Sequence, residues 1–162
     1  MKCLVISDTH GNAQVIGNLL CMHKDAEVVF FLGDGLCDLE LYISDKTRAF
    51  FAVRGNCDSY GFLGDVMVKK LDSITLLGHR ITFTHGDLYG AKYGLDGLKL
   101  LATESSSDII LFGHTHQPLE KYISTDDGGY YLFNPGSASV IGRSYGIINI
   151  TEKGILLSHG TF

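Results

Sequence analysis

The sequence contains no tryptophan, only two prolines, and no C-x-x-C pair among its four cysteines. It also lacks a long hydrophobic run. A membrane span needs about 20 consecutive apolar residues, whereas the first apolar segment, Cys3–Ile6, is followed at once by Ser7 and Asp8. We therefore expect no membrane association and no secretory signal peptide. Without a sign of export, reduced thiols and a cytoplasmic location are expected.

Basic residues are also scarce. Lys and Arg together number 13 against 18 Asp and Glu, which gives a formal net charge of −5. The basic residues are scattered along the chain, and Lys69-Lys70 is their one doublet. Binding of long nucleic acids relies on clustered Lys and Arg. The charge pattern therefore argues against a long nucleic acid as a partner.

The length and composition of the chain fit one globular domain over residues 1–162. Of the 162 residues, 45% are hydrophobic and 19% are charged, which is enough to build a core that holds buried polar groups in place. Glycine is abundant, with 20 residues. Many of these glycines follow short apolar runs, so strands that end in tight loops are expected.

Five short apolar runs predict buried strands. They are Cys3–Ile6, Val28–Leu32, Ala49–Val53, Ile81–Thr84 and Ile109–Phe112. Apolar residues at helical spacing follow the candidate N-cap Asn12 and predict a helix between the first two strands. Weaker patterns predict a helix around Leu95–Ala102 and a short one within Asp38–Ser44.

Hairpins are expected in the middle and at the end of the chain. Gly78-His79, between Ser73–Leu77 and Arg80–Thr84, has the glycine-first order of a type II′ turn. Two further turns are predicted at Asp126–Gly129 and Thr151–Gly154. The combination of β-α-β units with hairpins predicts an α/β sandwich of two mixed sheets with helices outside.

Residues that bind metals follow each of the five apolar runs. The segments are Asp8-Thr9-His10, Gly33-Asp34-Gly35, Gly55-Asn56-Cys57-Asp58, His85-Gly86-Asp87 and Gly113-His114-Thr115-His116. Because the carboxyl ends of parallel strands meet at one edge of a sheet, these side chains are expected to converge. The candidate ligands are Asp8, His10, Asp34, Asn56, His85, His114 and His116.

Seven candidate ligands exceed the needs of one ion in an open catalytic site and suit two ions that share a carboxylate. Imidazole mixed with carboxylate and amide oxygen favours Mn²⁺, Ni²⁺, Co²⁺, Fe or Zn²⁺ over Ca²⁺ or Mg²⁺. We expect two divalent ions, with Mn²⁺ first. A pair about 3.5–4 Å apart activates a bridging hydroxide and clamps the attacking and leaving oxygens at phosphorus. The pattern therefore predicts phosphoester hydrolysis.

The ordered motifs D-x-H, G-D, G-N-x-D, a single H after a strand, and G-H-x-H resemble those of the calcineurin-like metallophosphoesterases over nearly the whole chain. The Gly55–Asp58 motif and the Asn134–Ser137 turn resemble the small bacterial and archaeal phosphodiesterases of the YfcE type. The resemblance implies a four-layer α/β/β/α sandwich and a homo-oligomer. It also implies activity on small phosphodiesters with Mn²⁺ or Ni²⁺.

The same resemblance implies a role for each candidate ligand. One ion would be held by Asp8, His10 and His116, the other by Asn56, His85 and His114, and Asp34 would bridge them. The residues expected to act in catalysis are Asp34, Asn56, His10 and Cys57. Asp58 is expected to be a turn residue or to support a ligand rather than bind an ion.

Two positions depart from the larger relatives. Cys57 stands where those relatives carry a histidine thought to protonate the leaving group, and a thiol with a pKa of about 8.5 is a weak donor. Good leaving groups should therefore be favoured. Asp87 stands where relatives often carry histidine. Its charge would offset that of the metal centre, which predicts a preference for diesters over dianionic monoesters.

Other functions fit parts of the pattern. Vps29, a scaffold subunit of the retromer coat, resembles this family without being an enzyme, so a protein-interaction scaffold is the main alternative. Because every ligand position is filled here, an enzyme is favoured. A phosphomonoesterase or protein phosphatase is a further alternative. A nuclease acting on short or cyclic nucleotides ranks third.

Overall fold

The structure, a computed structural model, describes residues 1–126 and 128–162. Asp127, in the predicted Asp126–Gly129 turn, lies outside the described residues. In chain order the elements are β1 (Lys2–Ile6), α1 (Ala13–Met22), β2 (Val28–Phe31), α2 (Leu36–Glu40), β3 (Ala49–Ala52), β4 (Phe62–Leu63), β5 (Val66–Met67), β6 (Leu71–Leu76), β7 (His79–Thr84), a 3₁₀ turn (Asp87–Tyr89), α3 (Asp96–Ser105), β8 (Ile109–Leu111), β9 (Pro118–Thr125), β10 (Gly128–Pro135), β11 (Ser144–Thr151) and β12 (Gly154–Thr161).

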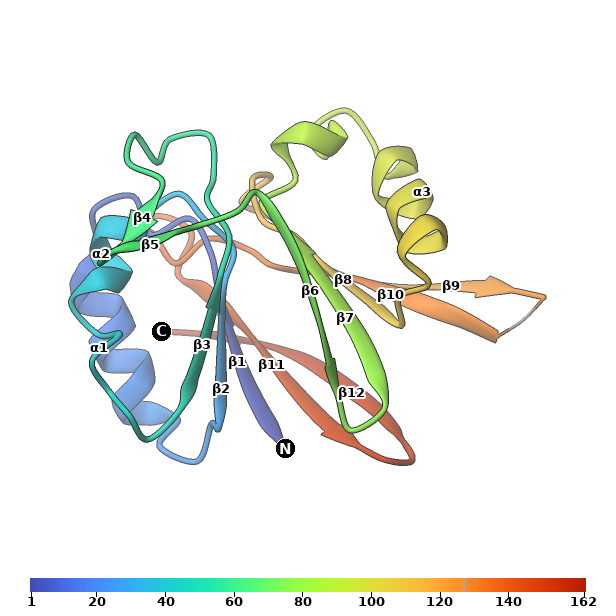
Figure 1. The fold of residues 1–162 in the computed structure, drawn as a ribbon, viewed down its shortest axis with the longest axis horizontal. Helices are drawn as coiled ribbons and strands as arrows, with labels where there is room; N and C mark the ends of the chain where they lie inside the picture. The colour runs from blue at the N-terminus through green and yellow to red at the C-terminus, as the bar shows by residue number, and fades with distance from the viewer. Residues whose placement is uncertain (127) are drawn as a thin grey trace.

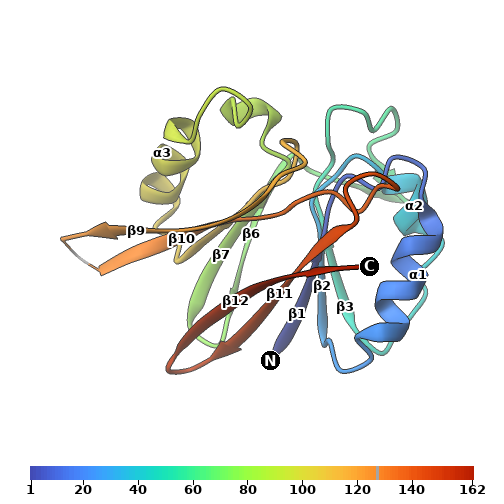
Figure 2. The same ribbon diagram turned by 180° about the vertical axis from the view of Figure 1, so that it is seen from behind.

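Two five-stranded mixed sheets form the centre of the molecule. Their strand orders are β12-β11-β1-β2-β3 and β6-β7-β8-β10-β9. Figures 1 and 2 show α1 and α2 outside the first sheet and α3 outside the second. The predicted α/β sandwich is therefore confirmed. In the described part of the chain, no helix combines the length and the apolar character that crossing a membrane requires.

The layers follow from strands that are apolar on both faces. In β1, Leu4 and Ile6 pack in the core under α1 and α2, while Cys3 and Val5 pack in the core between the sheets. The rings of Phe30 and Phe83 meet there, with centroids 5.3 Å apart. A third core joins α3 to the outer face of the second sheet. Alternate side chains of one strand thus serve two cores, which produces the α/β/β/α order.

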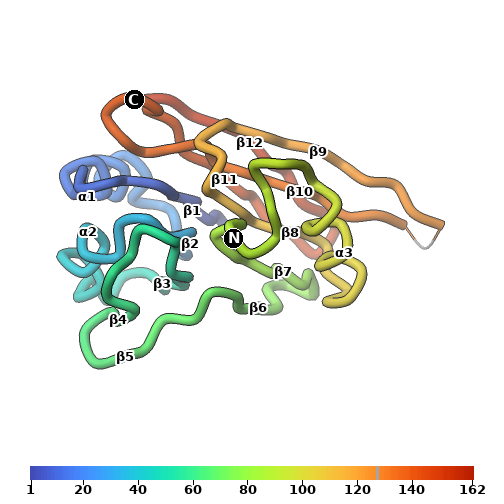
Figure 3. The backbone as a smooth tube through the Cα atoms, turned by 90° about the horizontal axis from the view of Figure 1, so that it is seen from above, coloured from blue at the N-terminus to red at the C-terminus, as the bar shows by residue number. Residues whose placement is uncertain are grey.

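The parallel strands bring their carboxyl ends to one edge of the sandwich. β1, β2 and β3 run parallel in the first sheet, and β7, β8 and β10 run parallel in the second. Figure 3 looks down on this edge and shows the loops of both sheets meeting there. The predicted ligand segments leave five of these strands at their carboxyl ends.

Two local predictions were wrong. The β6–β7 loop is Leu77-Gly78, not Gly78-His79, because both loop residues adopt positive φ (49° and 86°) and His79 already pairs with Leu76. Positive φ at both positions is typical of a type I′ turn, whose twist matches that of the strands. The short helix begins at Leu36 rather than near Asp38, because the Asp58 carboxylate accepts hydrogen bonds from the amides that start it.

Candidate metal centre

The backbone of the ligand loops is held in an unusual conformation. Eight non-glycine residues of the described ranges have positive φ, and five of them are candidate ligands. These five are Asp8, His10, Asp34, His114 and His116. A left-handed conformation costs a non-glycine residue about 1–3 kcal/mol and persists where the surroundings impose it, often at functional sites. Other interactions of the fold therefore offset the strain of the conformations that orient these five side chains.

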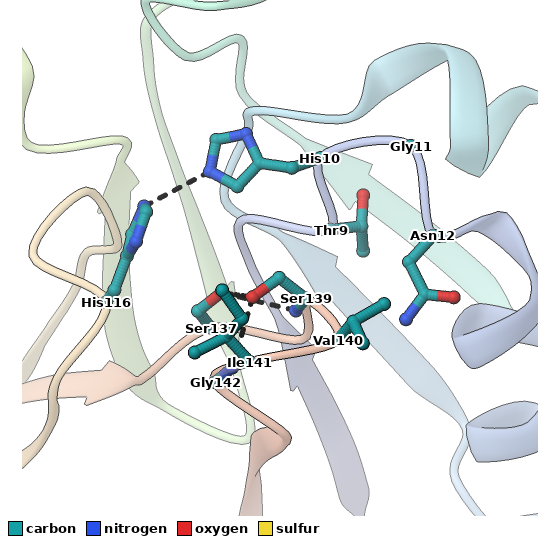
Figure 4. Close-up of a pocket in the computed structure, with 10 residues that line it drawn as sticks. All are labelled: Thr9, His10, Gly11, Asn12, His116, Ser137, Ser139, Val140, Ile141 and Gly142. Carbon is teal, nitrogen blue, oxygen red and sulfur yellow. Dashed lines mark hydrogen bonds between the residues drawn. The ribbon is translucent and has the colours of Figure 1, made fainter.

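The first group of ligand atoms comprises Asp8 Oδ1, His10 Nε2 and His116 Nε2. The two histidine nitrogens lie 3.1 Å apart, a contact drawn as a dashed line in Figure 4, and His116 Nε2 lies 3.2 Å from Asp8 Oδ1. Asp8 Oδ1 is buried and has no hydrogen-bond partner among the residues that the structure describes. An orphaned buried carboxylate oxygen is costly, and a cation between the three atoms would remove that cost. The residues therefore fit a divalent ion.

The second group surrounds His85. Its Nε2 lies 3.1 Å from Asn56 Oδ1, 3.2 Å from His114 Nδ1 and 3.4 Å from Asp34 Oδ2. Its other nitrogen, Nδ1, lies 2.7 Å from the carbonyl oxygen of Leu32, so it must donate a proton there. That bond fixes the ring and leaves Nε2 facing the centre, the arrangement that metal-binding histidines favour.

Asp34 lies between the two groups. Ligand atoms of Asp8, Asp34 and His85 all lie within 4.8 Å of one another, and so do those of His10, Asp34 and Cys57. Asp34 Oδ1 also accepts a hydrogen bond from the backbone N–H of Cys57 at 2.7 Å. All seven candidate ligands are thus brought together, and Asp34 lies near members of both groups.

Several supporting residues carried no metal-binding signal in the sequence. Ser7 donates to Asp8 Oδ2 at 2.6 Å, and the backbone N–H of His114 donates to the same oxygen. These bonds leave only Oδ1 turned to the centre. Ser137, in the Asn134–Ser137 turn, donates to the backbone oxygen of Asp8 at 2.9 Å.

Asp58 supports the loop without facing the ligands. Its two carboxylate oxygens accept hydrogen bonds at 2.7–2.9 Å from the backbone amides of Asp34, Gly35, Leu36 and Gly55. This agrees with its expected role as a turn residue. Glycine is required beside it, because a Cβ on Gly55 would lie 2.0 Å from Asp34 Oδ1.

In the second group, burial and neighbouring charges shift the pKa values of Asp34, His85 and His114. Burial opposes ionisation of Asp34, but its hydrogen bond and proximity to His85 outweigh burial and hold the pKa of the carboxyl well below its ordinary value. Burial likewise disfavours a charged His85, yet the bond to Asp34 raises the pKa of the imidazole. Burial and the neighbouring His85 and Lys92 lower the pKa of His114. The carboxylate of Asp34 therefore favours a positive charge at His85.

The two departures from the larger relatives also have defined surroundings. Burial and the neighbouring Asp34 raise the pKa of the Cys57 thiol, so it stays protonated and weakly acidic.

Asp87 Oδ2 accepts a hydrogen bond from Lys70 Nζ at 2.9 Å, while Asp87 Oδ1 is buried without a partner among the described residues. The Lys70–Asp87 pair is neutral as a whole. The expectation that Asp87 offsets the charge of the centre therefore has to include Lys70, whose position beside Asp87 was not predicted.

The comparisons with known proteins agree with this geometry. Residues 1–153 match the calcineurin-like phosphoesterase superfamily domain. The chain belongs to this superfamily. It is 33% identical to the probable metallophosphoesterase YsnB of Bacillus subtilis, over 85% of this chain and 75% of that protein. It is 26% identical to the phosphodiesterase YfcE of Escherichia coli, over 86% and 80% of the two chains.

The fold is also shared with a protein of a different kind. The crystal structure of Vps29 from Entamoeba histolytica, complexed with Zn²⁺, superposes with a TM-score of 0.74 at 22% identity and covers 99% of each chain. At that identity the similarity shows the fold alone. The family implies divalent metal ions, and the phosphoesterase domain of this chain carries the side chains to hold them.

The raised pKa of His85 predicts that metal affinity depends on pH. A metal ion must displace the proton from His85 Nε2, so each pH unit below the raised pKa should weaken binding about tenfold. Metal affinity should fall as the pH falls, because a proton and a metal ion compete for His85 Nε2. Mn²⁺ titrations followed by electron paramagnetic resonance at pH 8, 7 and 6 measure this. A His79→Gln variant, altered on β7 away from the ligands, should keep the wild-type profile. Equal affinity at pH 8 and pH 6 would contradict the competition.

Proposed function

We propose that this chain hydrolyses small phosphodiesters at a dinuclear metal centre. The observation that supports this most is that the seven candidate ligands, from both sheets, form two adjoining groups, one around the buried Asp8 Oδ1 and one around His85 Nε2. The relative named as a phosphodiesterase supports the reaction class. Mn²⁺ is the proposed ion, and a cytoplasmic homo-oligomer is the proposed state of the protein.

The proposed roles are those that the family resemblance implies, and the distances between the side chains are compatible with them. Asp8, His10 and His116 would hold one ion, and Asn56, His85 and His114 the other. When bound, the pair would supply an activated water and stabilise the charge that develops on the phosphoryl oxygens. Asp34 would bridge the ions and stay ionised, since its pKa is depressed. Cys57, beside Asp34, would donate at most weakly to the leaving group.

Reconstitution tests this function. The protein is stripped with a chelator, loaded singly with Mn²⁺, Ni²⁺, Co²⁺, Zn²⁺ or Mg²⁺, and assayed on diesters and monoesters, including cyclic nucleotides. We expect turnover only with metal, highest on diesters and with Mn²⁺. Metal content is measured in parallel. Two bound ions per chain without turnover of any ester would contradict the enzyme and support a scaffold of the Vps29 type, which the shared fold favours as second candidate.

Cys57→His should raise the turnover of esters with poor leaving groups. An imidazole protonates a departing alkoxide better than a thiol, and general acid catalysis contributes about 100-fold or more. The ratio of kcat/KM for alkyl esters to that for p-nitrophenyl esters measures the change. Cys37→His is the matched control, because Cys37 lines the same hollow as Cys57 and belongs to none of the ligand groups. An unchanged ratio in Cys57→His would exclude a leaving-group role at this position.

Replacing Asp87 should shift the preference toward monoesters. Asp87→Asn leaves the Lys70 ammonium without its partner, and the added positive charge favours a dianion over a monoanion by about threefold or more. The ratio of monoester to diester kcat/KM measures the shift. The double variant Lys70→Gln/Asp87→Asn removes both charges and should return the wild-type ratio. The same change in the double and single variants would show that Lys70 is not the cause.

A further inference from the structure

A pocket of about 550 Å³ opens beside the first group of ligand atoms. Figure 4 shows it between the loop that carries His10, the start of α1 at Asn12, and the loop of residues 137–142. His10 and His116 line it as well as belonging to the candidate metal centre. The pocket and the centre therefore open onto each other. We call it the Val140–Ile141 pocket, after the two apolar residues in its wall.

Within residues 1–126 and 128–162, the apolar wall of this pocket is largely uncovered. Val140 is 75% exposed and its neighbour Ile141 is 94% exposed, although most side chains of this type are buried in this fold. Each Å² of apolar surface removed from water is worth about 25 cal/mol. Two adjacent aliphatic side chains next to a polar metal centre thus offer binding energy to any ligand that covers them.

The loop that carries Val140 and Ile141 is hydrogen-bonded to Ser7 and Asp8, which follow β1. Ser137 Oγ donates to the backbone oxygen of Asp8 at 2.9 Å, and the backbone N–H of Ala138 donates to the oxygen of Ser7 at 2.9 Å. Asn12 Nδ2 donates to the carbonyl of Ala138 at 3.3 Å. These bonds hold the pocket wall at a constant position relative to Asp8. A ligand bound at the centre would find the apolar wall already in place.

Charge distinguishes this pocket from the hollow on the other side of His10. That second hollow is lined by Asp34, Asp38 and Asp58. The residues that line the Val140–Ile141 pocket include no carboxylate and no lysine or arginine. An anion at the metal centre is not repelled from the neutral side, and a neutral organic group attached to it can enter there without desolvating a charge.

We infer that the Val140–Ile141 pocket binds the ring-bearing organic group, aryl or nucleoside, of the phosphoester whose phosphate occupies the metal centre. The volume lies within the range of about 300–1,000 Å³ that small-molecule sites occupy, and it exceeds what a methyl ester would fill. The inference rests on the proposed function and adds the substrate class. Substrates with a ring next to the phosphate are selected by this pocket over short alkyl phosphates.

Two phosphonates that the enzyme does not hydrolyse test the inference. Phenylphosphonate and methylphosphonate carry the same acid group and differ in the organic group, so the ratio of their dissociation constants reports on the pocket alone. Binding to the Mn²⁺-loaded protein is measured by calorimetry. We expect the phenyl compound to bind about tenfold more tightly. In Val140→Ser/Ile141→Ser the ratio should approach one, with the affinity for methylphosphonate unchanged.

The controls separate the possible failures. Leu156→Ser changes an exposed leucine on β12 and should keep the tenfold ratio, and thermal unfolding verifies that each variant is folded. A ratio near one in the wild type, or a tenfold ratio that survives in the double variant, overturns the inference while leaving the diesterase proposal intact. Failure of both phosphonates to bind, together with no turnover of any diester, overturns the proposed function and the inference with it.

Discussion

The Asp34→Asn variant should retain less than about one hundredth of the wild-type kcat/KM on a diester. Asp34 lies within 4.8 Å of ligand atoms of both groups, and we propose that its carboxylate bridges the two ions. An amide has the same shape but no charge, and only one of its two arms can coordinate. The bridge would therefore be lost while the fold remains.

Metal content and a matched variant sharpen this result. Asp34→Asn should bind fewer than two Mn²⁺ ions per chain, measured by elemental analysis after gel filtration. Asp65→Asn, in the exposed β4–β5 turn, removes one carboxylate from the surface and should retain wild-type activity and metal content. Full activity with two ions in Asp34→Asn would remove Asp34 from the proposed mechanism.

Asp58→Ala should lower the free energy of unfolding by about 3 kcal/mol or more and abolish activity. The substitution removes the acceptor of four backbone amides, at Asp34, Gly35, Leu36 and Gly55. Hydrogen bonds to a charged acceptor are worth about 1.5–3 kcal/mol each, and partial exposure to water reduces the total. Without them, Asp34 is no longer held in its left-handed conformation.

Chemical denaturation of the metal-free protein measures the stability effect separately from metal binding. Asp58→Asn keeps one carbonyl oxygen and should lie between the wild type and Asp58→Ala. Asp65→Ala, an exposed aspartate outside the ligand loops, should change the free energy of unfolding by less than about 0.5 kcal/mol. If Asp58→Ala unfolds at the wild-type denaturant concentration, the carboxylate has no structural role.

The parts of the site that depend on strand ends were predictable from the sequence. Asp8, Asp34 and His85 each follow an apolar run directly, and the rule that parallel strands end at one edge was sufficient to bring them together. The sandwich itself followed from runs that are apolar on both faces. The residue-level assignment of ions to ligands stays a prediction, since it rests on the family resemblance.

The parts that depend on contacts between distant loops were not predictable. Nothing near Lys70 in the sequence indicates that it pairs with Asp87, because Lys70 precedes β6 and Asp87 begins the 3₁₀ turn between β7 and α3. The start of α2 depends on Asp58, which is more than twenty residues away. Likewise, the wall formed by Val140 and Ile141 reads in the sequence as an ordinary apolar pair. Long-range hydrogen bonds and exposure are properties of the folded chain alone.

The origin of the ligands in two different sheets has a consequence beyond catalysis. Asp8, Asp34 and Asn56 come from the first sheet, and His85 and His114 from the second. A cation bound by ligands from both sheets would connect the two sheets at the edge where their loops meet. Metal binding would then add a second connection between the two sheets, beyond the core that already packs them together.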